Sequence, residues 1–561
     1  MTGEGSLRQS MSWLHGWAGL VLGWLLFAVF LTGTIAYFRQ EVTAWMQPEL
    51  AGSVPSPQAA ELAVAALQQR APDAGSWRIG LPTPRSNTVS ISWQDRQSLD
   101  VKRGEERGGR GGRGGGRRGG GESLILDAST GAVLTPRKTA GGNFLYRFHF
   151  ELYALPREWA RWIVGLATMA MFVAIISGII THKKIFKDFF TFRPAKGQRS
   201  WLDAHNATAV LSLPFHIMIT FSGLLLFAST LLPLTERFAG GEDRRGERGA
   251  ARALEAAHIE SLQNRAASDV AGGAALAPLV PMLAEAEKLW GQPVSRITIT
   301  DPGRPGAMVE LLPTWNDKLI QHSGSGGLGA VKMRFGGRTG ERLESEEDLP
   351  ETLTARVDTA LGSLHRARFA APTLRWLFFL TGVGGTIMVG SGLILWSVKR
   401  AQRLRGAPPG RGHRFVDHMN VAGVAGLFIA VAAYFWANRL LPTGLAGRGE
   451  WEIRAFFAVW CLCLLHPLIR PLKRAWIEQL SLGGLLFAGI PVLNAITTRA
   501  HLGNTLVSGN WIYAGFDIVA LVTGICLLQA ARRVALHRPR AIASQPPLMP
   551  AASAYTAQAA E

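Results

Sequence analysis

The sequence is poor in cysteine. It contains three cysteines among 561 residues, Cys461, Cys463 and Cys526, and all three fall inside long apolar segments. Neither a disulfide framework nor a cysteine-based metal site is indicated, so we interpret these side chains as packing residues. The sequence also lacks a dinucleotide-binding fingerprint, because its one glycine-rich tract does not lie between a strand and a helix.

Acidic residues are the second shortage, since 40 Asp and Glu residues stand against 59 Lys and Arg residues and leave a net charge of +19. In a soluble protein, such an excess would suggest a nucleic-acid partner. Here the basic residues cluster between apolar segments, which favours a membrane protein and no nucleic acid. The clusters lie at residues 183–199, 399–414, 470–474 and 532–540.

Charge is nearly absent from eight apolar segments. A bilayer core of about 30 Å requires roughly 20 apolar residues in a helix, and a helix satisfies its own backbone hydrogen bonds in lipid. We therefore predict about eight transmembrane helices. The first segment is too long for a cleaved signal peptide, so we expect a retained anchor. The segments lie near residues 13–38, 159–181, 208–233, 374–398, 416–436, 453–468, 480–493 and 511–531.

The basic clusters occupy alternate loops, which predicts a topology with both termini in the cytoplasm. The fold class is an α-helical polytopic membrane protein with two small α+β domains outside, inserted between the first and second and between the third and fourth helices. The predicted order is helix (1–38), external domain (39–157), helix (158–182), cytoplasmic loop (183–202), helix (203–234), external domain (235–372), helix (373–398), cytoplasmic loop (399–415), four further spans (416–532) and cytoplasmic tail (533–561).

Each external segment has the pattern of one helix followed by strands. The predicted elements lie at residues 57–70, 89–93 and 124–126 of the first segment and at residues 280–289, 295–300 and 331–335 of the second. Thr130-Gly131 and Thr339-Gly340 occupy matching turns, where glycine permits a backbone that most residues resist. Residues 103–121 are so rich in glycine and arginine that we expect a disordered loop; RNA binding by this tract is the less favoured interpretation.

The membrane segments contain an internal repeat. Each unit consists of a helix, an external domain and a second helix, and the unit is present twice. Aligned in this way, the matching positions are His15 and His205, Gly33 and Gly223, His149 and His365, Arg161 and Arg375, and Ser177-Gly178 and Ser391-Gly392.

Six histidines lie on or beside the first four predicted spans, where an ionisable residue is costly and suggests function. A lone histidine at a helix end is more often interfacial or hydrogen-bonded, but the repeat places two of these at equivalent cytoplasmic ends and two at equivalent external ends. His205 and His216 are 11 residues apart, which on a continuous helix puts them on one face about 16 Å apart. The candidates are His15, His149, His182, His205, His216 and His365.

Imidazoles at two depths of a helix bundle favour haem as the cofactor. Zinc normally takes four nitrogen or sulfur ligands, and copper would favour cysteine or methionine nearby. Haem requires one or two axial histidines, apolar walls and basic residues for its propionates. The candidates for the last role are Arg147, Arg161, Arg366 and Arg375, for which the membrane interface is the alternative explanation.

At these residues the chain resembles the PepSY-associated transmembrane family, which includes iron-regulated and ferric-siderophore-reductase members. The resemblance lies in residues 12–38, 148–151 (FHFE), 162–182, 197–227 and 364–396, and the last four spans are similar to the extension of longer members. It implies PepSY domains in the periplasm and two b-type haems. It implies His15 with His205 as iron ligands toward the cytoplasm and His149 with His365 toward the outside, with His216 or His182 as possible replacements.

The resemblance further implies a bacterial inner-membrane electron-transfer protein. Its acceptor would be a ferric siderophore or another ferric chelate in the periplasm, and its donor a cytoplasmic protein or a quinol. Two other classes remain open. One is a transporter or permease for a chelate or small solute, with Asp517 in the last span, and the other is a non-enzymatic regulator of a periplasmic partner.

Overall fold

The computed structural model describes residues 7–96, 122–181, 198–231, 257–264, 266–267, 276–314, 332–345, 353–404 and 408–537. His182 and the predicted glycine-arginine loop at residues 103–121 lie outside the described residues, as do most of the loop predicted at residues 183–202 and the tail beyond residue 537.

Six helices in the described chain are long and apolar enough to cross a membrane, and there are up to eight candidate spans if each of two bent pairs counts as one. The chain is therefore a multi-pass membrane protein. The six are α7 (Arg157–Thr181), α16 (Pro372–Arg403), the run of α17 (Arg411–Asn420), η3 (Val421–Ala425) and α18 (Gly426–Leu440), then α19 (Arg448–Ile469), α20 (Leu472–Thr497) and α22 (Trp511–Leu536).

The first and third predicted spans are bent rather than straight. α1 (Leu7–Val21) and α2 (Gly23–Ala36) meet at 66°, and the helices α9 (Gln198–Leu211) and α10 (Leu213–Leu226) meet at 69°. Pro214 lies in the first turn of α10, where its missing N–H interrupts the hydrogen-bond ladder that a continuous helix would need.

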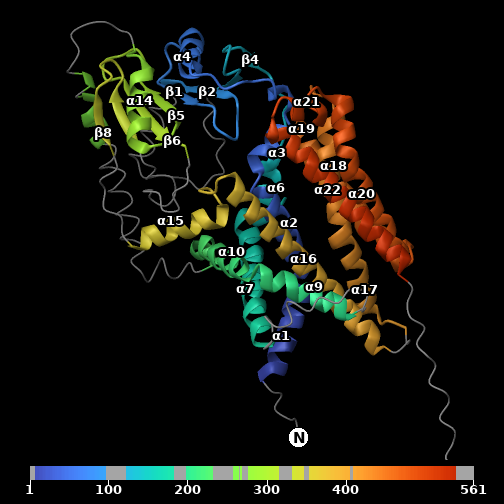
Figure 1. The fold of residues 1–561 in the computed structure, drawn as a ribbon. Coiled ribbons are helices and arrows are strands. Elements are labelled where there is room, and N and C mark those ends of the chain that lie inside the picture. The colour runs from blue at the N-terminus through green and yellow to red at the C-terminus, as the bar shows by residue number, and fades with distance from the viewer. Residues whose placement is uncertain are drawn as a thin grey trace, which may run out of the picture.

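Shorter helices lie near the ends of the spans. They are α3 (Arg39–Trp45), η1 (Pro48–Leu50), α6 (Gly141–Glu151), α11 (Ala228–Leu231), α15 (Leu353–Arg366) and α21 (Leu502–Val507). α3 and α6 lie between the spans and the sheet described next (Figure 1). This end of the molecule is called the sheet end below.

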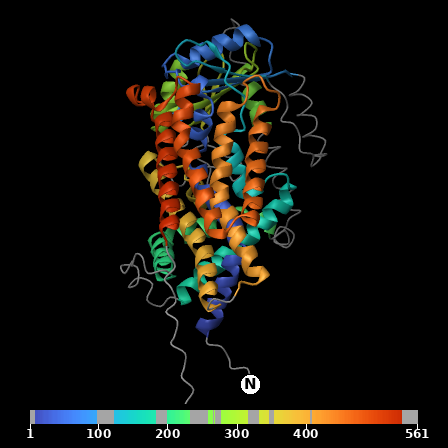
Figure 2. The ribbon, with the colours of Figure 1, turned by 90° about the vertical axis from the view of Figure 1, so that its right-hand side faces the viewer.

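The two predicted α+β units form one antiparallel sheet of eight strands in the order β4-β3-β2-β1-β5-β6-β7-β8. The units join edge to edge, because β1 pairs with β5 and Ile79 lies opposite Ile297. Figure 2 shows the sheet above the helix bundle. The strands are β1 (Ser76–Gly80), β2 (Val89–Gln94), β3 (Ser123–Leu126), β4 (Val133–Leu134), β5 (Val294–Thr300), β6 (Met308–Pro313), β7 (Met333–Gly336) and β8 (Arg342–Ser345).

Two helices, α4 (Ala59–Arg70) and α14 (Leu279–Trp290), bury a shared core with the alternate apolar side chains of the strands. The two matching turns are present as predicted, since Gly131 and Gly340 have φ angles of +71° and +73°. Each glycine N–H bonds the carbonyl four residues earlier, that of Asp127 or Gly336. The repeat seen in the sequence therefore extends to backbone conformation.

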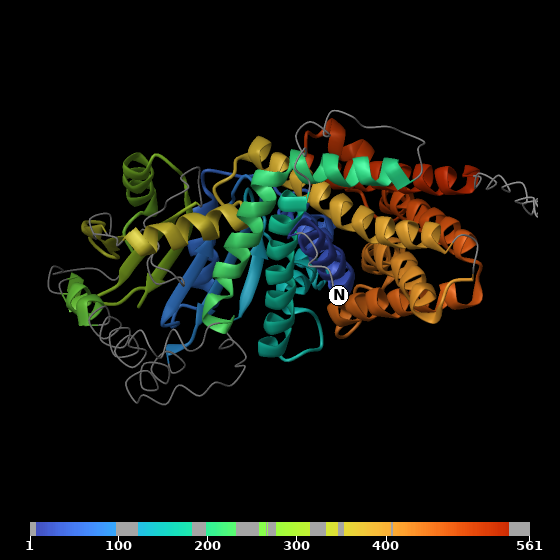
Figure 3. The same cartoon turned by 90° about the horizontal axis from the view of Figure 1, so that it is seen from below.

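The C-terminal helices pack beside the first four spans (Figure 3) and are joined to them by buried polar contacts at the sheet end. The Arg439 guanidinium of α18 lies 3.8 Å from the centre of the Trp45 ring and donates to the Trp45 carbonyl at 2.6 Å. Asp517 of α22 accepts hydrogen bonds from Trp45 Nε1 at 2.9 Å and from Asn494 Nδ2 at 3.0 Å. These contacts fix α3 against three C-terminal helices.

A second set of contacts surrounds Glu452 of α19. Its carboxylate pairs with Arg448 at 2.6 Å, and both side chains are completely buried. It also accepts hydrogen bonds from Thr139 Oγ1 at 2.7 Å and from Asn438 Nδ2 at 2.7 Å. Together these side chains form the buried polar network, which comprises Trp45, Thr139, Asn438, Arg439, Arg448, Glu452, Asn494 and Asp517.

Removing one partner from the buried ion pair should loosen the C-terminal helices. We predict that Glu452→Gln lowers the free energy of unfolding by about 3 kcal/mol, because the Arg448 charge remains buried without its carboxylate. The matched control is Glu450→Gln on the same helix, where the Glu450–Arg454 pair is more than half exposed and should contribute less than about 1 kcal/mol. Thermal unfolding of the detergent-solubilised protein measures the effect of both substitutions. Equal Tm shifts would contradict the structural role assigned to the buried Arg448–Glu452 pair.

Candidate functional site

The structure brings His15 of α1 and His205 of α9 together among the spans. Their ring centres are 6.1 Å apart and their planes are inclined at 78°. His15 Nδ1 lies 2.8 Å from the carbonyl oxygen of Ala174 in α7, and His205 Nδ1 lies 2.9 Å from that of Met388 in α16. Because a carbonyl oxygen only accepts, each Nδ1 carries the proton and each Nε2 keeps its lone pair.

His149 of α6 and His365 of α15 form a second pair, with ring centres 6.2 Å apart and planes inclined at 42°. His149 Nδ1 lies 2.7 Å from the carbonyl oxygen of Val29 in α2. His365 Nδ1 lies 3.0 Å from Ser222 Oγ and bonds the carbonyl of Ile219 in α10. The second pair therefore repeats the arrangement of the first, with Nδ1 of each ring engaged by a neighbouring helix.

Each of the four imidazoles lies against a glycine. A Cβ atom built on Gly33 would come within 2.6 Å of the His149 ring. In all four cases the carbonyl that binds Nδ1 belongs to the residue four positions before the glycine, on the same face of the helix. The distances from a built Cβ to the ring are 3.3 Å for Gly178 and His15, 3.2 Å for Gly392 and His205, and 3.2 Å for Gly223 and His365.

The residue before each of these glycines is serine or threonine, and its hydroxyl donates to its own helix backbone. The contacts are Thr32 to Ala28, Ser177 to Ala174, Ser222 to Met218 and Ser391 to Met388, at 2.6–3.1 Å. The small hydroxyl side chain thus satisfies its own polar group inside the bundle, and the glycine beside it provides the flat surface for the imidazole.

The separation within each pair suits coordination of one metal atom from two sides. Such imidazoles have ring centres about 6 Å apart, because each metal–nitrogen bond is about 2 Å long and each ring centre lies about 1 Å behind its Nε2. The described residues contain no group of three or more His, Cys, Asp or Glu side chains placed to hold a metal ion. Zinc, which takes four protein ligands, fits a two-imidazole site poorly, whereas iron porphyrin needs only axial ligands.

The two repeat-related arginines are engaged by carboxylates. Arg161 Nη2 lies 2.9 Å from Glu151 Oε1, and Arg375 Nη1 lies 3.4 Å from Glu41 Oε1. Arg375 also donates to the Ala370 carbonyl at 2.8 Å. Both side chains therefore have a carboxylate partner at the sheet end, while the Nε atom of each is buried without a hydrogen-bond partner in the described part of the chain.

A different set of arginines lies beside the second histidine pair. Burial, together with the neighbouring guanidinium groups of Arg366 and Arg39, lowers the pKa of Arg368 to about 10, and the Tyr146 hydroxyl opposes this shift. Arg39 lies 4.6 Å from the centre of the Tyr146 ring, and Arg366 directly follows His365. Three cations held this close favour an anion among them. Sequence reasoning named only Arg366 of this group.

His216 belongs to neither pair. It is 1% exposed, its ring lies 6.0 Å edge-on from Phe30, and its Nε2 has no hydrogen-bond partner in the described part of the chain. His205 and His216 do not share one helix face as their spacing predicted, because the helix breaks at Ser212 and turns by 69°. The placement of His182 lies outside the described residues.

The four glycines could have been identified as contact positions from the sequence, because the internal repeat aligns them in two pairs. The sequence did not indicate which imidazole each glycine contacts. His15 contacts a glycine in the second helix of its own repeat, and His149 contacts one in the first helix of its own repeat. The order of residues along the chain does not predict which face of a bent helix meets which neighbour.

These features define a class: a multi-pass membrane protein with a two-part antiparallel sheet at one end and two half-buried histidine pairs among its helices. Residues 12–399 match the family described as the PepSY-associated TM region, and the chain belongs to that family. The expected family membership is confirmed.

A curated relative, an uncharacterized protein of Pseudomonas aeruginosa, is 25% identical over 383 residues, which is 66% of this chain and 90% of the relative. The family match ends at residue 399, before α17 begins. The C-terminal helices from α17 to α22 therefore lie beyond the matched region, whereas all eight glycine and histidine positions of the two pairs lie within it.

The contact of imidazole with glycine should be sensitive to one added methyl group. We predict that Gly33→Ala lowers the free energy of unfolding by about 1–3 kcal/mol, because the new Cβ would overlap the His149 ring. Gly19→Ala in the same span is the matched control, since no atom lies within 4 Å of its built Cβ and alanine favours a helix. A thermal unfolding series in detergent tests this, and a Gly33→Ala variant as stable as Gly19→Ala would count against the packing described.

Proposed function

We propose that this protein is a membrane electron-transfer protein that holds b-type haem at each histidine pair and reduces ferric iron, as a siderophore or another chelate, outside the inner membrane. One observation carries the proposal. Two pairs of imidazoles have ring centres 6.1 and 6.2 Å apart, and in each ring Nδ1 contacts a neighbouring helix, which assigns metal ligation to Nε2.

The chain's own residues set the orientation of these ligands before any cofactor binds. The hydrogen bond at Nδ1 fixes the tautomer and the rotation of each ring, as second-shell partners of metal-binding histidines commonly do. The glycine beneath each ring keeps the imidazole close to the helix that bears the carbonyl. Haem iron held by two imidazoles would supply reversible one-electron chemistry.

The arginine cluster beside the second pair supports an anionic group at that site. Arg39, Arg366 and Arg368 come from two segments of the chain, and the first two lie close enough to lower the pKa of Arg368. Porphyrin propionates are anions of the kind such a cluster would bind. Arg366 and Arg368 follow His365 within three residues. The same segment would therefore provide both a ligand to the iron and the positive charge for the propionates.

The two pairs lie at different depths, which suits transfer across a bilayer. Thr168 of α7 lies beside Gly223, which contacts His365, whereas Gly178 of the same helix contacts His15. Ten residues of helix separate Thr168 from Gly178, which corresponds to about 15 Å along the axis.

The proposal puts the acceptor outside, because the basic loops predict a topology with both termini in the cytoplasm and the sheet in the periplasm. Fe(III) prefers hard oxygen ligands, so one-electron reduction weakens a ferric chelate and releases the iron. The donor would be a cytoplasmic protein or a membrane quinol. Asp517 does not support a transport pathway through the last span, because its carboxylate accepts hydrogen bonds from Trp45 and Asn494 within the buried polar network.

The experiment that tests the proposal is an optical spectrum of the purified, detergent-solubilised protein before and after reduction with dithionite. The proposal expects a reduced b-type spectrum with about two haems per chain. Protein made with ample haem supply that shows no Soret band would contradict it.

Substitutions should reveal which histidines share a group. We predict that His15→Ala, His205→Ala and their double variant each remove about one haem per chain, because both side chains ligate the same iron. His149→Ala and His365→Ala should behave alike at the other site, and His15→Ala combined with His365→Ala should remove both haems. Exposed His258→Ala is the control.

The haemochrome assay gives the haem-to-chain ratio, and ferric reduction should disappear in every variant of either pair. If the double variant of one pair lost twice as much haem as either single variant, the pairing would be wrong. Variants that all retain two haems per chain would also contradict it.

A further inference from the structure

A pocket of about 340 Å³ lies at the sheet end, between α6, the loop that follows it, the first turn of α7 and α19. Its volume is in the range of small-molecule sites. The proposed electron-transfer role does not use it. Its lining from α6 and α19 consists of Ala140, Asn143, Phe144, Arg147, Phe148, Glu151 and Ile453, and residues 152–155 and Arg157 complete it.

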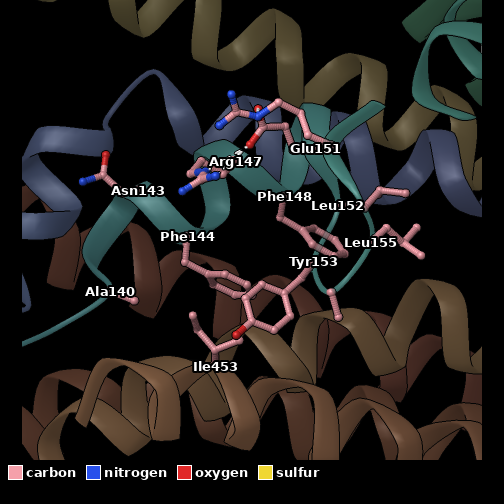
Figure 4. Close-up of a pocket in the computed structure, with 12 residues that line it drawn as sticks. Ala140, Asn143, Phe144, Arg147, Phe148, Glu151, Leu152, Tyr153, Leu155 and Ile453 are labelled. Carbon is pink, nitrogen blue, oxygen red and sulfur yellow. Dashed lines mark hydrogen bonds and ion pairs between the residues drawn. The ribbon is translucent and has the colours of Figure 1, made fainter. Parts of the chain in front are cut away.

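Aromatic rings form the inner wall of the pocket. Phe144 lies 5.9 Å from Tyr153 and 6.0 Å from Phe148, and Tyr153 stacks on Phe457 of α19 at 5.4 Å. Figure 4 shows Phe144, Tyr153 and Ile453 directed toward one another in the middle of the pocket. Tyr153 is nevertheless 44% exposed, so one ring face is open to a ligand. Aromatic ligands gain from such walls through offset or edge-on contacts.

The mouth of the pocket carries an excess of positive charge. Glu151 is 8% exposed and pairs with Arg147 at 3.0 Å, with Arg157 at 2.8 Å and with Arg161 at 2.9 Å. One carboxylate therefore faces three guanidinium groups. Arg147 and Arg157 are about 60% exposed, so their remaining donors are open to an anion that arrives from water.

The loop that closes the pocket is held in an unusual conformation. Leu152 and Ala154, on either side of Tyr153, have φ angles of +53° and +62°, a region that residues with a side chain rarely adopt. Such backbone is retained where the surroundings fix it, and it is concentrated at binding sites. Here the strained loop directs Tyr153 onto Phe457.

The C-terminal helices supply one wall of the pocket. Ile453 and Phe457 belong to α19, beyond the family match that ends at residue 399. The pocket also lies directly behind the second histidine pair. Phe148 lines the pocket while His149, its neighbour in α6, bonds to Val29 on another side, so the imidazole and the pocket are separated by about the width of one helix, roughly 10 Å.

We propose that this pocket binds an anionic aryl group, a catecholate or phenolate arm of a ferric chelate, and so selects the substrate that is reduced at the second histidine pair. The inference rests on the proposed function. The rings of Phe144 and Tyr153 stack on the aryl group, and Arg147 and Arg157 bind its oxygen anions. A membrane quinone is the weaker fit, because the exposed residues at the mouth are charged.

The test is isothermal titration of the full-length, detergent-solubilised protein with a ferric catecholate complex, compared with ferric acetohydroxamate, which has no ring. The proposal expects saturable binding of the catecholate and at least about tenfold weaker binding of the hydroxamate. Arg147→Gln should weaken catecholate binding about tenfold, and Tyr153→Leu about threefold to tenfold.

The matched controls lie on α19 outside the pocket lining, where Arg454→Gln and Trp451→Leu should leave binding unchanged. Haem content and Tm of every variant are measured beside the titration, so a misfolded protein is recognised. Arg157→Gln serves as a second variant if Arg147→Gln fails to fold.

Three outcomes would overturn the inference: no saturable binding of the catecholate, binding that Arg147→Gln and Tyr153→Leu leave unchanged, or a quinone analogue that competes for the site. Failure of the proposed function has a different signature, because a protein without haem that still binds the catecholate would retain the pocket and lose the electron-transfer role.

Discussion

The contact between an imidazole and a glycine is the constraint on which the rest of the structure depends. The ring lies against the helix only where no side chain projects, and there its Nδ1 reaches the carbonyl one turn earlier. The contact occurs four times, and each time it joins two helices of one repeat: α1 with α7, α2 with α6, α9 with α16, and α10 with α15. Helix packing and ligand orientation therefore have the same cause.

Duplication explains why the pairs form between the repeats. His15 belongs to the first repeat and His205 to the second, and the same holds for His149 and His365. The sheet is divided in the same way, since β1 of the first repeat pairs with β5 of the second. Each half alone would leave a single imidazole at each depth and an unpaired strand edge. Joining the halves completes the sheet and both histidine pairs at once.

Much of this could be predicted from the sequence, because hydropathy and internal repetition are local signals. The long apolar segments, the glycine turns and the equivalence of the four histidines were all visible. The breaks near Leu22 and Ser212 were not, because a run of apolar residues predicts helix but not its direction. β1, β4, β6 and β8 were not predicted, and they are recognisable as strands only through the neighbours with which they pair.

The roles of charged residues were the least predictable, because they depend on contacts between distant segments. Arg161 and Arg375 align in the repeat, yet each pairs with a carboxylate, and Arg368, which the repeat did not single out, lies in the cationic cluster. Asp517 suggested a transport pathway by position alone. Its actual partners lie on α3 and α20, far away in the sequence.

The C-terminal helices give this chain features that the matched family region does not contain. Through the buried polar network they hold α3 and the segment before α6, and through α19 they complete an aromatic wall behind His149. The histidine pairs lie within the matched family region, and so do eleven of the twelve residues that line the pocket. Ile453 of α19 is the lining residue that the extension supplies.

The most direct measurement of the central claim is a cryo-electron microscopy map of the full-length protein purified with its native cofactors. The account predicts two flat densities, one between His15 and His205 and one between His149 and His365, each ligated on both faces through Nε2 while Nδ1 keeps its bond to the neighbouring helix. A map in which the paired imidazoles contact only protein, water or lipid would contradict it.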